Sequence, residues 1–243
     1  MSLAIPAATV RGLASLRAQA ATFERFRGFD RCVRKLRASA SAAGGGGGGG
    51  EIPIGAVAEL YAHWGDPPTQ ADESFLRSCL AEVAQAPGAI VQCGASLLTL
   101  VLGSVCQGEA AAARQLWCLE HDAHWASVVR SWLTQYRIGN THVITTRAQL
   151  ADGYVWYGVD PERLAGNISL LLCDGARATP QGVIGALERI GSRLAPSSTV
   201  LARHVSRADD VRAVQAWAKA HDAACVVVDR QQGFIKLSRR AAG

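Results

Sequence analysis

Small and polar residues follow a series of apolar runs, at the points where the runs end. Gly94 follows the first run, Glu120 the second and Asp174 the fourth. A glycine lets the backbone approach a ligand closely because it has no Cβ. An ionised carboxylate only accepts hydrogen bonds, so Glu120 is suited to hold both hydroxyls of a sugar ring. The pattern predicts a ligand site built from several strand ends. The full candidate set is Gly94, Ala95, Ser96, Glu120, His121, Thr146, Arg147, Asp174 and His204.

The apolar runs predict the strands that position this set. They are continuous rather than alternating, as expected for strands covered on both faces. Helical periodicity separates them, and such a βα repeat indicates a parallel sheet with helices on both sides. Open sheets of this kind bind ligands beyond the carboxyl ends of their strands. The expected strands are 89–93, 115–119, 141–145, 168–173 and 198–202, and the expected helices lie near 96–106, 122–137, 180–194 and 207–221.

The rest of the chain divides by composition. We expect residues 1–43 to form a basic helical arm, 44–50 a polyglycine linker, 51–88 a helical cap and 89–243 the main α/β domain. A run of glycines buries no side chain and loses much entropy if ordered, which favours a flexible linker. Two apolar runs around 229–233 predict a closing β-hairpin whose second strand lies antiparallel in the sheet.

Positive charge is concentrated in the arm. Residues 1–43 hold eight basic and two acidic residues, whereas the net charge of the whole chain is only +5. The main domain therefore gives no electrostatic reason to expect nucleic acid as a partner, while the arm is suited to dock a protein partner or an anionic surface. No apolar run is long enough to predict a transmembrane segment.

The cysteines predict neither a metal site nor a disulfide framework. There are seven of them, an odd number, and no CxxC pair occurs. Most fall inside apolar runs, where a free cysteine behaves as a small apolar residue. This usage favours a reducing, cytoplasmic location. We expect no metal among the cofactors.

Residues 89–238 resemble the class I S-adenosylmethionine-dependent methyltransferases. The matching pieces are, in order, IVQCGASLLTLVLG, LWCLEHDAHWASVVRSWL, HVITTRAQL, LLLCDGAR and ACVVVDRQQGFIKL. They are similar to the family's glycine-rich first motif, the acidic residue after its second strand, its adenine-side loop, its fourth-strand acidic motif and its final hairpin. The resemblance implies a Rossmann-like doubly wound sheet with the first strand central, S-adenosyl-L-methionine as cofactor, and methyl transfer to a small-molecule acceptor.

The resemblance also implies roles on the cofactor side of the site. Gly94–Ser96 would hold the amino-acid end of the cofactor. Glu120 would bind the ribose, with His121 beside the adenosine. The pair Thr146 and Arg147 would lie near the adenine.

On the acceptor side, Asp174 would lie by the transferred methyl group. Either Asp174 or His204 would take a proton from a hydroxyl acceptor. Two irregular stretches carry Trp64, Trp156 and Tyr157. These side chains would either wall an acceptor pocket or, as is commoner for aromatic residues, pack as a lid or in the core. The Pro-Pro motif of amino-directed nucleic-acid methyltransferases is absent after Asp174, which disfavours base methylation.

Two other functions remain open. Gln92 stands where the family usually has an acidic residue, and Ala95-Ser96 occupy the place of a second glycine. These departures favour a catalytically decayed relative that acts as a binding or scaffold protein. A nicotinamide-dependent oxidoreductase is the third possibility. It is disfavoured because the first strand is not followed by GxGxxG, which the pyrophosphate requires for close backbone approach.

Overall fold

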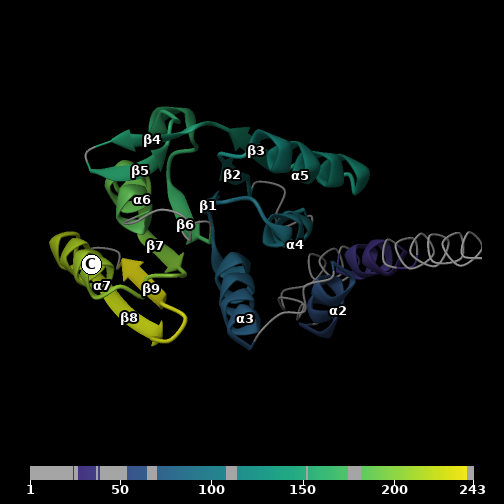
Figure 1. Cartoon of the computed structure of the whole chain (residues 1–243), viewed down its shortest axis with the longest axis horizontal. Coiled ribbons are helices and arrows are strands. Elements are labelled where there is room, and N and C mark those ends of the chain that lie inside the picture. The colour runs from purple at the N-terminus through teal and green to yellow at the C-terminus, as the bar shows by residue number, and fades with distance from the viewer. Residues whose placement is uncertain are drawn as a thin grey trace, which may run out of the picture.

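The strands form a seven-stranded sheet in the order β3-β2-β1-β6-β7-β9-β8, with helices on both faces (Figure 1). The computed structural model describes residues 24, 27–36, 38, 54–64, 70–107, 114–151, 153–174 and 182–239. The sheet strands are β1 (Ala89–Cys93), β2 (Leu116–Glu120), β3 (Thr141–Thr145), β6 (Ile168–Cys173), β7 (Leu194–Ala202), β8 (Ala223–Asp229) and β9 (Phe234–Arg239).

The topology confirms the Rossmann-like, doubly wound prediction. β1 is central and pairs in parallel with β2 and β6, and β6 pairs in parallel with β7. β9 lies antiparallel to β7, as predicted for the second strand of the closing hairpin, and β8 forms the edge. The predicted linker at 44–50 lies outside the described residues, and the domain boundaries stay predictions.

Helices cover the two faces of the sheet in separate groups (Figure 1). One face carries α2 (Ile54–Trp64), α3 (Gln70–Gln85), α4 (Leu97–Cys106) and α5 (Ala123–Gln135), and the other carries α6 (Gly182–Ile190) and α7 (Ala208–Ala220). Successive residues of a buried strand serve opposite faces. Accordingly Ile90 packs into the core on the α2–α5 face of the sheet, and Val91 packs into the core on the α6–α7 face. Both are fully buried.

Local signals start the two helices that border the candidate site. The Ser96 hydroxyl accepts the backbone N–H of Leu98, and Thr99 returns a bond to the backbone of Ser96, which forms a capping box at the start of α4. Asp122 caps α5 by accepting the N–H of Trp125. This hydrogen bond lowers the pKa of the Asp122 carboxyl below its ordinary value. Such caps satisfy N–H groups that the helix itself leaves unpaired.

Two features differ from the sequence-based prediction. The irregular stretch after β3 contains a second, two-stranded antiparallel sheet, β4 (Ala148–Ala151) with β5 (Tyr154–Tyr157). β7 begins at Leu194, four residues before the predicted start at 198, and follows a short 3₁₀ turn, η4 (Gly191–Arg193). A further 3₁₀ turn, η2 (Pro161–Arg163), precedes β6.

The described part of the basic arm packs against the domain. Residues 27–36 form a helix whose apolar side chains Phe29, Val33 and Leu36 are buried. The Phe29 ring lies 6.1 Å from the ring centroids of both Trp132 and Tyr136 at the end of α5.

None of the helices within the described ranges has the length and apolar character needed to cross a bilayer.

A glycine in the final hairpin holds the segment that follows β7. Gly233 has φ +61°, and a Cβ there would lie 2.5 Å from the backbone nitrogen of Val205. Its carbonyl accepts that same N–H at 3.0 Å. Any side chain at 233 would therefore strain the backbone and push residues 203–205 away from the sheet.

We predict that Gly233→Ala lowers the free energy of unfolding by about 1–3 kcal/mol, the usual cost of a strained backbone position. Gly55→Ala is the control, because a Cβ at Gly55 in α2 meets nothing within 4 Å. It should leave stability unchanged or raise it by up to ~1 kcal/mol. Urea denaturation measures both, and equal stability of the two variants would contradict the prediction.

Candidate functional site

The carboxylate of Glu120 joins the loop after β1 to the end of β2. Its side chain is only 4% exposed. Oε2 accepts the backbone N–H of Ala95 at 2.8 Å, and Oε1 accepts those of His121 at 2.7 Å and Asp122 at 2.8 Å. The His121 ring Nδ1 lies 3.0 Å from Oε1. Charge-assisted bonds of this kind are the strong ones, so Glu120 organises both segments.

Hydrogen bonds from several elements fix the loop after β1. Gly94 has φ +93°, a conformation that favours glycine, and donates its N–H to Leu119 O at 2.8 Å. The indole Nε1 of Trp125 donates to Ala95 O at 2.8 Å. The Ser96 N–H bonds to Thr99 Oγ1 at 3.0 Å. The N–H groups of Gly94, Ala95 and Ser96 are thus all engaged within the chain.

Gln92 lies beneath this loop and has a free acceptor. It is fully buried, and its Nε2 donates to Gly94 O at 2.9 Å and lies 3.4 Å from Ser96 Oγ. Its Oε1 has no hydrogen-bond partner. The Gly94 carbonyl sets the amide orientation, because a flipped amide would place two acceptors together. A buried orphan acceptor of this kind fits a ligand that brings an N–H donor.

Asp174 meets the same loop from the β6 side. Its Oδ2 lies 3.5 Å from the donating Ser96 hydroxyl, and its backbone N–H donates to Cys93 O at 3.2 Å. Arg203, at the end of β7, places Nε 3.4 Å from Asp174 Oδ1. The Arg203 guanidinium in turn lies 5.0 Å above the centre of the Phe75 ring of α3. Cation–π contact of this kind holds the arginine between the carboxylate and the helical cap.

The structure therefore brings Gly94, Ala95, Ser96, Glu120, His121 and Asp174 together through direct contacts. Thr146 lies next to them, since its N–H donates to Glu120 O at 2.9 Å. Arg147 is exposed at the start of the β4–β5 hairpin, and its carbonyl accepts the N–H of Gly158. His204 has φ +65° and donates its N–H to Gln232 O at 3.2 Å, so its backbone is tied to the closing hairpin.

Of the three aromatic side chains weighed for the acceptor side, Trp156 packs in the core. Its side chain is only 5% exposed and lies on the α6–α7 face of the sheet. Tyr157 is half-buried, and its ring lies 6.3 Å from that of His121, on the Glu120 side of the site. Burial raises the pKa of the Tyr157 hydroxyl above its ordinary value. The Trp64 side chain lies outside what the structure describes.

Sequence reasoning missed Trp125 and Arg203 as site residues. Each acts through a partner distant in the chain, Ala95 and Asp174 respectively. Trp125 follows the Asp122 cap, and Arg203 directly precedes His204 at a strand end. The sequence therefore placed both residues next to candidate site residues. Their contacts depend on which strands are neighbours, which the sequence pattern does not state.

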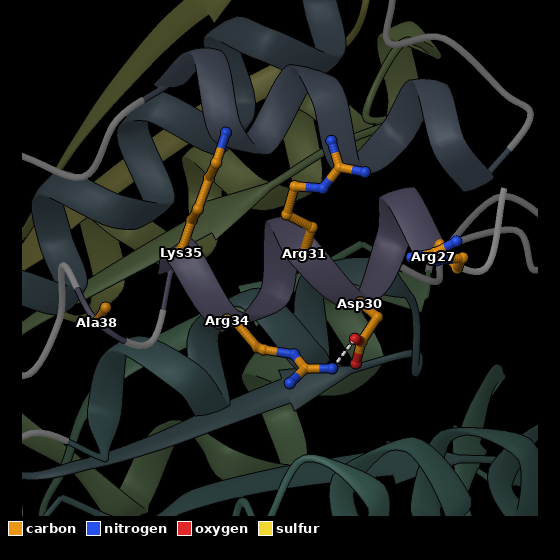
Figure 2. Close-up of a pocket in the computed structure, with 6 residues that line it drawn as sticks. All are labelled: Arg27, Asp30, Arg31, Arg34, Lys35 and Ala38. Carbon is orange, nitrogen blue, oxygen red and sulfur yellow. Dashed lines mark hydrogen bonds and ion pairs between the residues drawn. The ribbon is translucent and has the colours of Figure 1, made fainter. Parts of the chain in front are cut away.

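A separate cavity lies against the arm helix. Its volume is about 560 Å³, and it is lined by Arg27, Asp30, Arg31, Arg34, Lys35 and Ala38. Figure 2 shows Arg31 and Lys35 projecting from one side of the helix, while Arg34 pairs with Asp30 on another. Lys35 also pairs with Glu59 of α2. The surface is basic, and partner docking by the arm stays a prediction.

No protein-family model matches the chain, and no curated protein matches it in sequence. Several solved structures are similar. An O-methyltransferase from Bacillus cereus, in complex with SAH, is 15% identical over 77% of this chain and 90% of its own, with a TM-score of 0.51. A methyltransferase from Geobacter sulfurreducens is 14% identical over 79% and 90%, with a TM-score of 0.51.

A protein from Staphylococcus aureus assigned as a caffeoyl-CoA O-methyltransferase is 12% identical over 78% of this chain and 93% of its own, with a TM-score of 0.55. At these identities the similarity is one of fold. The chain has the Rossmann-like fold of class I methyltransferases, as its motifs predicted.

We predict that Glu120→Ala lowers the free energy of unfolding by at least about 2 kcal/mol, because several backbone N–H groups lose a charged acceptor. Trp125→Phe is the matched comparison. It removes the indole bond to Ala95 O and keeps an aromatic ring beside Trp132, so it should cost about 1 kcal/mol. Chemical denaturation without ligand compares the two. Equal costs would show that Glu120 does not organise the loop.

Proposed function

We propose that this protein binds S-adenosylmethionine and transfers its methyl group to a small-molecule acceptor. The observation that carries the proposal is the convergence of two acidic residues on one loop. Glu120 contacts Ala95 and Asp174 contacts Ser96. The two acidic residues follow β2 and β6, the strands that flank β1 on either side. Several proteins with this fold are O-methyltransferases, one of them in complex with SAH, which supports the cofactor and the reaction class.

The residues present fit such a cofactor. Its amino-acid part carries an ammonium group, and the buried, unpartnered Oε1 of Gln92 would accept one of its N–H groups. Each carboxylate oxygen has two acceptor positions, and Oε2 of Glu120 uses one of them for Ala95. The other would accept one ribose hydroxyl. His121 and Tyr157 would border the adenosine, with Thr146 and Arg147 on the adenine side.

On the acceptor side, the chain's task is alignment. When bound, S-adenosylmethionine supplies an electrophilic methyl group. Asp174, fixed by Ser96 and Arg203, would orient the acceptor and take its proton if the acceptor is a hydroxyl. His204 is the second candidate for that proton. Phe75 of α3, buried in the core, lies under the Arg203 guanidinium and would keep it beside Asp174.

A non-catalytic binding role is the second candidate, and one observation favours it. The N–H groups of Gly94, Ala95 and Ser96 are all bonded within the chain, whereas glycine-rich cofactor loops offer such groups to the ligand. Gln92 also lacks the charge that would complement an ammonium group. Failure to bind S-adenosylhomocysteine would favour this scaffold role.

We predict that Gln92→Glu separates these functions. In the free chain the new carboxylate would face Gly94 O, so stability should fall by about 1–3 kcal/mol. A bound ammonium group would relieve that repulsion, so S-adenosylhomocysteine should bind roughly ten- to a hundredfold more tightly than to the wild type. Titration calorimetry and thermal unfolding, with and without ligand, measure both effects.

Gln149→Glu is the charge-matched control, because Gln149 is exposed on β4 and should change neither quantity. NAD serves as a control ligand and should not bind. If wild type and Gln92→Glu both fail to bind S-adenosylhomocysteine, the methyltransferase proposal is wrong. If both bind equally well, the ammonium group does not lie at Gln92.

A further inference from the structure

The outward side of the arm helix, residues 27–36, carries one kind of side chain. Every exposed residue in this range is basic, and the set is Arg27, Arg31, Arg34 and Lys35. Steps of three or four residues connect these positions, a spacing that makes helical residues neighbours on one side. These four residues form the basic strip.

The basic strip retains an excess of positive charge. Its residues line the cavity of about 560 Å³ together with Asp30 and one alanine, so the lining holds four positive charges and one negative charge. Arg34 pairs with Asp30, and Lys35 lies 3.5 Å from Glu59 of α2. Arg31 forms no salt bridge within the described part of the chain, and Figure 2 shows its guanidinium on the side away from the Arg34–Asp30 pair. The basic strip therefore suits an anionic partner.

The opposite, apolar side of the arm helix is already buried by the protein itself. Phe29, Val33 and Leu36 are at most 5% exposed, and the Phe29 ring packs near Trp132 and Tyr136 at the end of α5. An interfacial amphipathic helix binds a membrane by burying its apolar face among the lipids. The arm helix cannot do so while it is packed on the domain, so it offers a partner charge alone.

We propose that the basic strip docks the protein, without insertion, on a bilayer surface that contains anionic phospholipids. Clusters of roughly four to eight Lys or Arg residues on an amphipathic helix bind such surfaces, and each cation near the surface strengthens binding by roughly fivefold. In the sequence, Arg25 and Arg37 extend the cluster to six. Three of the four cations in the strip are arginines, whose planar guanidinium forms two parallel hydrogen bonds with a phosphate. Headgroup phosphates along the strip would be bound in this way.

The charge distribution favours a flat anionic surface over a nucleic acid. Of the 25 basic and 20 acidic residues of the chain, eight and two lie in residues 1–43, so residues 44–243 hold 17 and 18. A nucleic acid that extends beyond the basic strip would meet this balanced remainder and gain little from it, because its binding depends on phosphate neutralisation. A bilayer touches only the side of the protein that carries the strip.

The basic strip and the candidate site lie at opposite ends of α5. This helix begins after its cap Asp122, which also contacts Glu120, and it ends at Tyr136, near the Phe29 ring of the arm helix. Its 13 residues span about 20 Å. Membrane docking is thus independent of the proposed methyl transfer.

Vesicle sedimentation of the full chain tests the docking. Wild type should sediment with vesicles that mix phosphatidylserine and phosphatidylcholine, less so as salt rises, and should stay in solution with pure phosphatidylcholine vesicles. Arg31→Glu reverses one charge of the strip and should weaken binding by roughly ten- to thirtyfold, and Arg31→Gln, which removes that charge, by roughly fivefold. Arg163→Glu makes the same change in net charge at an exposed position on η2 and should leave binding within roughly twofold of the wild type.

Arg31 is exposed and outside the salt bridges of the described residues, so its variants are expected to fold, and circular dichroism checks that they do. A wild-type chain that ignores the anionic vesicles, or binds neutral ones equally well, overturns the proposal. Equal weakening by Arg31→Glu and Arg163→Glu would trace binding to net charge and also overturns it. A single-stranded RNA oligonucleotide that binds more tightly than the anionic vesicles, and loses this affinity in Arg31→Glu, would assign the strip to nucleic acid instead.

Discussion

The buried carboxylate of Glu120 is the interaction on which the candidate site depends. It ends β2 and accepts backbone N–H groups from Ala95 in the loop after β1 and from His121 and Asp122, the two residues before α5. A buried carboxylate without such donors would be costly, and so would the N–H groups without an acceptor. The Glu120 carboxylate therefore accepts backbone N–H groups from two segments at once, and its position fixes the path of both segments. Trp125 closes the connection by returning a bond from α5 to Ala95.

Asp174 completes the arrangement from the other side of β1. It contacts Ser96, the residue that also caps α4, and it is held by Arg203 at the end of the next strand. Arg203 extends this connection to Phe75, so the helical cap before the sheet becomes part of the site. Glu120 at the end of β2 and Asp174 after β6 thus contact a loop with a single glycine, while Arg203 and Phe75 support Asp174 from behind. The loop keeps its shape because its polar groups are satisfied by the protein.

This arrangement defines how a ligand would be recognised. In most glycine-rich loops, free backbone N–H groups point at the ligand. Here the N–H of Ala95 points at Glu120 instead, and the free acceptor is the side-chain oxygen of Gln92. Recognition would therefore run through side chains, and little loop ordering would oppose binding because the loop is already held. The closing hairpin also holds the backbone of His204, whose N–H donates to Gln232 O.

The sequence by itself determined the fold class, the strands β1, β3 and β6 to the residue, and the clustering of Gly94, Glu120 and Asp174. Continuous apolar runs, caps and turns are local signals, and the carboxyl ends of parallel strands always meet at one edge. Tertiary structure decided the pairing of Asp174 with Arg203, the role of Trp125, the β4–β5 hairpin and the orphan acceptor of Gln92. These features depend on which strands are neighbours and which donors come within hydrogen-bond distance. Spacing along the chain carries no record of either, because each contact joins segments that only the completed sheet brings together.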